Sequence, residues 1–149
     1  MKAFGNIHND VEQVLDFYFK ACSISMSCSK LSRTFTVFAN QGKLIHNGEQ
    51  VLSPRRTKRI NAIMQTCGFY DEAGDFSFRV GLPGKSGVGG GIAAVHPFKF
   101  GVAVWSPPLN EKGNSKSGML ALEFLTSITG SSIFLLLADD CTKGGFPLL

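Results

Sequence analysis

The sequence contains no apolar run long enough to cross a lipid bilayer. Its longest apolar stretch, from Ile133 to Ala138, is far shorter than the about 20 residues that a spanning helix needs. The first residues, MKAFGNIHND, have no apolar segment after the basic residue, so they do not resemble a secretory signal. We therefore expect neither a membrane partner nor secretion.

Cysteine is scarce, and no C-x-x-C pair occurs. The four cysteines are irregularly spaced, at Cys22, Cys28, Cys67 and Cys141. A zinc site or a dense disulfide framework would need regular or closely spaced cysteines. The three histidines also lack metal-ligand spacing to one another. We therefore expect no metal site and a reducing, cytoplasmic location.

Charged residues are few, and one sign is in modest excess. They make up 17% of the 149 residues, whereas 44% are hydrophobic, so the chain can bury one core and forms one domain or part of one. The net charge is +4, but the only dense basic cluster is Arg55-Arg56-Thr57-Lys58-Arg59. We interpret it as a solvated helix face rather than a phosphate-binding patch, and expect no nucleic-acid partner.

The first half of the chain has apolar residues at helical spacing. Asn9 or Asp10 can cap a first helix that includes Tyr18. A second helix is expected from about Ser29 until Gly42 stops it, and residues 43–52 are expected to form a hairpin or turn. A third helix, preceded by Ser53 as its cap, is predicted to have Pro54 at its first position and Gly68 just past its end.

The second half is predicted to be rich in strands. Residues 76–80 alternate between apolar and polar side chains, which is typical of a strand with one buried face. Two more strands are expected at about 87–95 and 100–105, and an amphipathic helix is expected to start near Asn114 and cover the sheet. Helices, then antiparallel strands, then a covering helix indicate an α+β fold.

Two short motifs partly match known patterns, one for phosphate binding and one for catalysis. Gly84-Lys85-Ser86 resembles the end of a P-loop, but Arg79 occupies the position of the first glycine and a strand follows where a helix is required. Ser27-Cys28-Ser29-Lys30 has the S-x-x-K spacing that can activate a serine nucleophile. We interpret it as a serine-rich cap of the second helix, with the nucleophile pair as the alternative.

Longer motifs resemble the glutaminase family from about Phe4 to about Ile133. They are LDFYF at 15–19, MQTCGFYD at 64–71, FSFRVGLPGKSGVGGG at 76–91, VWSPPL at 104–109 and GNS at 113–115. On this resemblance, residues 1–134 are the C-terminal part of a glutaminase domain and residues 135–149 are a divergent tail. The implied fold is the C-terminal portion of the fold of serine β-lactamases and transpeptidases.

The resemblance also implies an activity and a set of site residues. Family members hydrolyse L-glutamine to L-glutamate and ammonia through a serine acyl-enzyme, without metal or organic cofactor, and a homo-oligomer is expected of the full-length family. By position, Tyr18 and Tyr70 match substrate-binding tyrosines. Lys85 lies on the strand that borders the cleft and is expected to be catalytic together with Tyr70. Val88 is expected to bind substrate, because its N–H matches an oxyanion-hole donor. Tyr70, beside an ammonium such as that of Lys85, could act as general base or proton shuttle.

Each of these residues also has an ordinary structural interpretation. Without the resemblance, Tyr18 is a core or rim aromatic, Tyr70 a turn residue and Lys85 a solvent-facing lysine. The family's nucleophilic serine and its lysine lie upstream of the Tyr18 helix, beyond Met1, so we expect this chain to be inactive alone. Two functions remain open: part of a glutaminase, or a catalytically empty interaction module or truncated-gene product.

Overall fold

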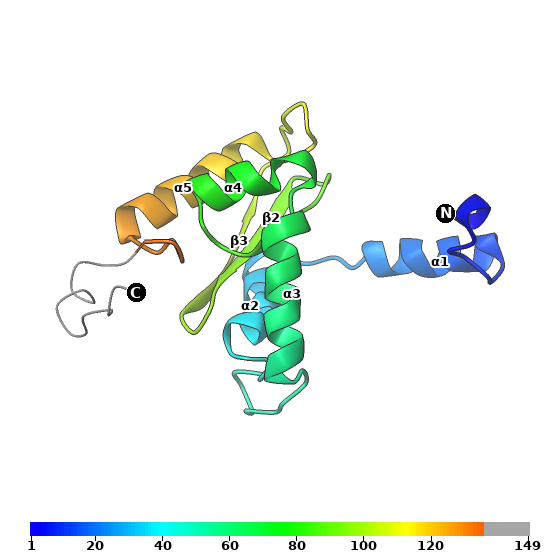
Figure 1. Cartoon of the computed structure of the whole chain (residues 1–149), viewed down its shortest axis with the longest axis horizontal. Coiled ribbons are helices and arrows are strands. Elements are labelled where there is room, and N and C mark those ends of the chain that lie inside the picture. Colours follow the sequence, from blue (N-terminus) through cyan, green and yellow to red (C-terminus); the bar gives the residue numbers. More distant parts are fainter. Residues whose placement is uncertain (136–149) are drawn as a thin grey trace, which may run out of the picture.

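The computed structural model describes residues 1–135, which form five α-helices, two short 3-10 helices and one three-stranded sheet (Figure 1). The α-helices are α1 (Val11–Cys22), α2 (Cys28–Ala39), α3 (Pro54–Cys67), α4 (Ala73–Arg79) and α5 (Lys116–Thr129). The strands are β1 (Gly84–Ser86), β2 (Gly91–His96) and β3 (Phe100–Trp105), and the 3-10 helices are η1 (Lys2–Phe4) and η2 (Tyr70–Glu72). The α+β prediction is confirmed.

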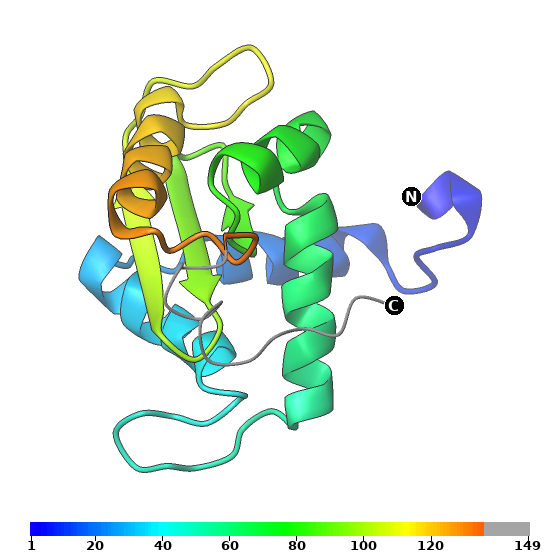
Figure 2. The ribbon, with the colours of Figure 1, turned by 60° about the vertical axis from the view of Figure 1, so that its left-hand side comes forward.

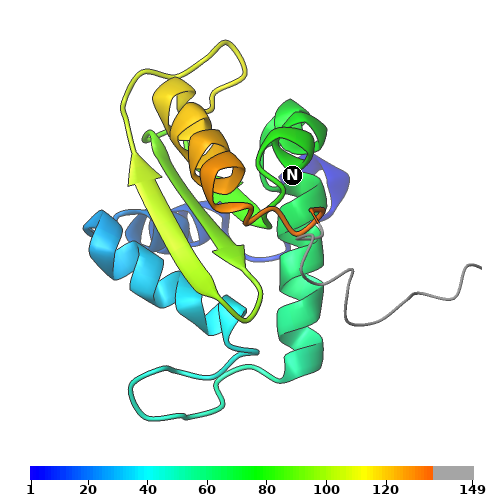
Figure 3. The ribbon, with the colours of Figure 1, turned by 90° about the vertical axis from the view of Figure 1, so that its left-hand side faces the viewer.

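The sheet is antiparallel, in the order β1-β2-β3, and helices cover both of its faces. Figure 3 shows α5 on one side of the sheet and α2 on the other. The central strand β2 contributes side chains to both faces of the sheet. Ile92 packs in a cluster with Leu122 of α5. Val95 packs in a second cluster with Ala39 of α2 and Met64 of α3. Alternate side chains of β2 therefore enter two different cores, which is why its interior reads as a continuous apolar run.

The larger core holds the segment between α3 and β1 in place. Phe69 and Phe76 are each 1% exposed, and their rings stack with centroids 3.6 Å apart. Leu82, which is fully buried, and Ile92 complete the same cluster. Burying two phenylalanines on either side of η2 fixes the positions of the residues between them.

The predicted strand at 76–80 is wrong, because most of this segment belongs to α4. Ala73, Phe76 and Val80 are buried at spacings of three and four residues, whereas Phe78 is 89% exposed. Ser77 Oγ donates to the Ala73 carbonyl one helical turn earlier, at 2.8 Å. In a segment of only five residues, the apolar positions of a strand and those of a helix largely coincide, so the pattern could not distinguish the two.

The other elements follow the predictions with small shifts. Asp10 caps α1, and Ser53 precedes Pro54 at the start of α3. The predicted strand at 87–95 begins only at Gly91, since residues 87–90 form a turn, and the short strand β1 precedes that turn. The basic cluster on α3 is exposed except for Thr57, as expected of a solvated helix face. Within residues 1–135, no helix is both long and apolar enough to span a bilayer.

Helix α1 projects from the rest of the protein (Figure 1). None of its residues is buried, and Phe17, Tyr18 and Phe19 are 75%, 60% and 58% exposed. Contiguous exposed apolar side chains of this kind mark surfaces that contact other protein. The predicted tail at 135–149 lies outside the described residues, apart from Leu135.

Ser27 caps α2, and its hydroxyl oxygen accepts a hydrogen bond from the Lys30 N–H at 3.2 Å. We predict that Ser27→Ala lowers the free energy of unfolding by about 1 kcal/mol, because it removes the acceptor at the helix start. Ser29→Ala, two positions further on, is the matched control and should change it by less than about 0.5 kcal/mol. Urea denaturation of both variants tests this. Equal stability of the two variants would show that the cap contributes nothing.

Candidate active site

Three of the four predicted site residues lie together. The Lys85 Nζ atom lies 4.9 Å from the centroid of the Tyr70 ring. A Cβ atom added to Gly113 would lie 3.9 Å from both Tyr70 Cε2 and Val88 Cγ1. Gly113 therefore stands between Tyr70 and Val88, and these residues come from η2, from β1 and the turn after it, and from the loop before α5.

Tyr70, the first residue of η2, has an unusual backbone conformation. Its φ angle is +50°, a left-handed value that is uncommon for a residue other than glycine, asparagine or aspartate. Its side chain is half-exposed, whereas its neighbour Phe69 is buried. Residues held in sparsely populated conformations cluster at functional sites, where the surrounding structure compensates the strain.

Lys85 occupies the middle of the three-residue strand β1. Gly84 and Ser86 on either side of it are buried, so alternation turns the Lys85 side chain away from the core. Its Nζ atom donates to the Ser86 carbonyl, and partial desolvation lowers the pKa of Lys85 although the residue is exposed overall. Desolvation therefore favours the neutral amine at Lys85 more than at a fully solvated lysine.

Val88 lies in a tight glycine turn between β1 and β2. The Gly87 N–H donates to the Gly91 carbonyl and the Gly90 N–H to the Gly87 carbonyl, both at 2.9 Å. Gly90 has a φ of +89°, and a Cβ atom there would lie 2.5 Å from the Ser106 carbonyl oxygen. Among residues 1–135, the Val88 N–H donates to no acceptor. This donor is therefore available to an incoming oxygen atom.

The end of α3 and strand β1 are joined through backbone atoms. The Ser86 N–H and the Ser86 hydroxyl both donate to the Gly68 carbonyl, at 3.1 and 3.3 Å. Gly68 lies so close to Gly84 that an added Cβ would be 1.8 Å from the Gly84 carbonyl oxygen. Because these contacts flank Lys85 and precede Tyr70, they fix the distance between the two side chains.

Tyr18 stands apart from this cluster, on the projecting helix α1. A hydrogen bond with Cys22 and the charge of the same thiol raise the pKa of Tyr18, and the charge of Tyr70 acts in the same direction. Within residues 1–135, no hydrogen bond or ring contact joins Tyr18 to Lys85 or Val88.

A carboxylate network beside Tyr70 was not predicted from the sequence. The Asn110 side-chain amide donates to both carboxylate oxygens of Glu72, at 3.0 and 2.8 Å, and the Asn114 amide donates to the same carboxylate. Partial burial alone would raise the pKa of Glu72, but these amides outweigh it and hold that pKa below its ordinary value. Glu72 is therefore held as a carboxylate.

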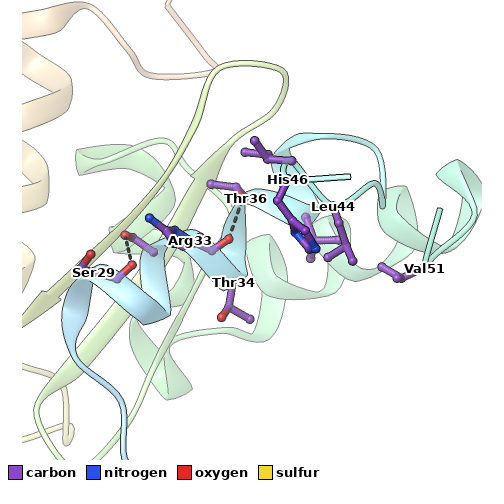
Figure 4. Close-up of a pocket in the computed structure, with 10 residues that line it drawn as sticks. Ser29, Arg33, Thr34, Thr36, Leu44, His46 and Val51 are labelled. Carbon is purple, nitrogen blue, oxygen red and sulfur yellow. Dashed lines mark hydrogen bonds between the residues drawn. The ribbon is translucent and has the colours of Figure 1, made fainter. Parts of the chain in front are cut away.

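The hollow drawn in Figure 4 lies elsewhere, between α2 and the loop around residues 44–51. None of the predicted site residues lines it. Its threonines bond within their own helix, since Thr34 and Thr36 donate to the Lys30 and Arg33 carbonyls at 2.9 and 2.5 Å. These two hydroxyls are thus occupied within α2, and we do not place the chemistry in this hollow. In the described part of the chain, no three His, Cys, Asp or Glu side chains are grouped as metal ligands.

Comparison with known proteins decides the family. The sequence model of the family described as glutaminase matches residues 1–134. The chain belongs to the glutaminase family. This glutaminase chain is 63% identical to a glutaminase of Christiangramia forsetii over 134 residues, which cover 90% of this chain and 44% of the relative. It therefore spans less than half the length of the curated relatives that it matches.

The chain has the fold of the corresponding part of solved glutaminases. A covalent complex of a Bacillus subtilis glutaminase with 5-oxo-L-norleucine superposes with a TM-score of 0.81 at 32% identity, covering 89% of this chain and 48% of that one. A probable glutaminase from Bacillus subtilis gives a TM-score of 0.85 at 31% identity, covering 89% and 46%. The predicted portion of a β-lactamase-like fold is confirmed.

Proposed function

We propose that this chain supplies one part of an active site that hydrolyses L-glutamine to L-glutamate and ammonia through a serine acyl-enzyme. The observation that carries the proposal is the grouping of three residues around the Tyr70 ring: Lys85 Nζ lies by its face, and Gly113 lies near both this ring and Val88. These residues present a phenol, an amine of lowered pKa and a backbone N–H that has no acceptor among residues 1–135. Acyl transfer from an amide needs such a combination of proton carrier and oxyanion donor.

In this mechanism a serine hydroxyl attacks the side-chain carboxamide carbon of glutamine. Tyr70 accepts the serine proton and passes it to the departing ammonia, while the Val88 N–H binds the oxyanion of the tetrahedral intermediate. Water then attacks the acyl-enzyme, and glutamate leaves as the serine regains its proton. The Lys85 Nζ atom lies 4.9 Å from the centre of the Tyr70 ring, where it can relay a proton during these transfers, and Tyr18 contacts the substrate.

We place the nucleophile in the part of the glutaminase domain that this chain does not span. Ser27 is unsuited, because its hydroxyl oxygen caps α2. The Bacillus subtilis relative formed its covalent complex by reaction with 6-diazo-5-oxo-L-norleucine, a diazo ketone whose diazo-bearing carbon takes the place of the glutamine amide nitrogen, which supports a nucleophile in that protein. We also place the completed enzyme in the cytoplasm, as a homo-oligomer.

Two surfaces support a requirement for the rest of the domain. The outer edge of β3 pairs with no strand among residues 1–135, and its sequence FGVAVW lacks the charges and proline that protect free edges. Helix α1 buries none of its residues. The same surfaces favour the second candidate, a catalytically empty interaction module.

A chimera tests the proposal. Residues 1–134 of this chain replace the matched 134 residues of the Christiangramia forsetii glutaminase, and glutamate and ammonia release from L-glutamine are measured. We expect a kcat within about tenfold of the relative's, because the site residues come together as a set. The 149-residue chain alone should release neither product. A folded but inactive chimera would favour the interaction module.

A further inference from the structure

The Glu72 carboxylate ties η2 to the loop at residues 110–114. The Asn110 amide spans both carboxylate oxygens, and Asn114, which is fully buried, donates both to this carboxylate and to the Phe69 carbonyl at 3.3 Å. The loop is itself closed, since the Asn110 side-chain oxygen accepts from the Asn114 N–H at 2.9 Å and from the Lys112 N–H at 3.1 Å.

These bonds hold the backbone on both sides of Tyr70. Phe69 precedes it and is held by Asn114, and Glu72 follows it and is held by both amides. The left-handed conformation of Tyr70 lies between these two attachments. A strained residue persists only where its surroundings over-determine it, and charge-assisted hydrogen bonds are about twice as strong as neutral ones. The same loop also places Gly113 against the Tyr70 ring.

We propose that Glu72, held by the amides of Asn110 and Asn114, is a positioning residue that sets Tyr70 against Lys85 and Val88. Glu72 acts through Tyr70 and does not itself touch the reacting atoms. The expected effect of Glu72 on kcat rests on the function proposed above. A shift of about 1 Å in a proton carrier can reduce the rate about a hundredfold. Loss of the Glu72 hydrogen bonds should therefore lower kcat.

The test variants exchange hydrogen-bond donors and acceptors between positions 72 and 110. Glu72→Gln keeps the shape of the side chain but leaves one acceptor for two amide donors, so an NH₂ group faces another NH₂ group. The double variant Glu72→Gln with Asn110→Asp reverses that pair, because the new amide at position 72 can then donate to the new carboxylate at position 110. Glu111→Gln is the matched control: it removes the same charge from the neighbouring exposed loop position, whose side chain makes no hydrogen bond within residues 1–135.

Activity is measured in the chimera described above. We expect Glu72→Gln to lower kcat about 10- to 100-fold with KM changed less than about threefold, because substrate contacts remain while the proton carrier is displaced. The reversed pair should restore kcat to within about threefold of the parent, and Glu111→Gln should leave it unchanged. A general loss of folded protein would lower the active fraction in all assays, so the fraction folded is measured by circular dichroism beside each value.

A spectroscopic measurement separates this proposal from the proposed function. A single 3-fluorotyrosine is placed at position 70 of both the chimera and the 149-residue chain, and its ¹⁹F signal is recorded. We expect Glu72→Gln to move the signal toward that of free fluorotyrosine and the reversed pair to restore it, whether or not the parent is active. An inactive parent with this pattern overturns the function but keeps the positioning role. The positioning role is overturned if Glu72→Gln leaves both the ¹⁹F signal unmoved and kcat within twofold of the parent. It is also overturned if the double variant folds but restores neither the signal nor kcat.

Discussion

Tyr70→Phe should lower the kcat of the chimera about 10²- to 10⁴-fold, the range that positioned general acid–base groups contribute. The substitution removes only the hydroxyl, so the ring can keep its place near the Lys85 amine and Gly113. We therefore expect the melting temperature to stay within about 2 °C of the parent's. Steady-state kinetics with L-glutamine, together with a thermal melt, measure both quantities.

Tyr18→Phe is the matched control for that result. Both substitutions remove one phenol, but Tyr18 lies on α1, and within residues 1–135 it makes no ring or hydrogen-bond contact with Lys85. If Tyr18 only contacts substrate, its loss should raise KM and change kcat less than about tenfold. A Tyr70→Phe chimera that retained kcat within threefold would exclude Tyr70 as the proton carrier, and Lys85 would then be the group to test.

Gly68→Ala should lower the free energy of unfolding by at least about 3 kcal/mol, the upper end of the usual cost of overpacking. The reason is space and not dihedral strain, since the φ of Gly68 is −76°. The new Cβ would lie 1.8 Å from the Gly84 oxygen and 2.4 Å from the Met64 oxygen. Both are backbone atoms that cannot rotate away, so α3 and β1 must separate. Urea denaturation of the chimera measures the loss.

Gly74→Ala provides the comparison within the same region. Gly74 lies inside α4, and an added Cβ would meet nothing within 4 Å. Because alanine loses less conformational entropy than glycine on entering a helix, we expect this variant to be up to about 1 kcal/mol more stable than the parent. Similar effects of the two substitutions would contradict the close approach of Gly68 and Gly84.

The helices could be predicted from the sequence because their ends carry local signals. Asp10 and Ser53 act through hydrogen bonds to residues three positions away, and Pro54 acts through its own backbone. The short helix α4 lacks such a start signal: Glu72 precedes it without a capping side-chain bond. Its identity depends on burial against Leu122 and Ile92 from distant parts of the chain, which no local pattern contains.

The candidate site was predictable only in part, for a similar reason. Tyr70, Lys85 and Val88 were found through long family motifs, and their convergence remained to be seen in the fold. The Glu72 network joins residues 38 and 42 positions apart, so spacing alone could not indicate it. The left-handed backbone of Tyr70 was equally hidden, because tyrosine is not a residue that ordinarily signals such a conformation.

Trp105, the last residue of β3, is the single tryptophan of the chain. Its indole N–H donates to the Gly89 carbonyl at 2.9 Å, one residue beyond Val88. Figure 2 shows the antiparallel strands β2 and β3 side by side. Its ring is 62% exposed, so its fluorescence responds to whatever displaces water or shifts the glycine turn. The 149-residue chain thus carries its own optical probe beside the oxyanion donor, and ligand titrations can be followed without attaching a dye.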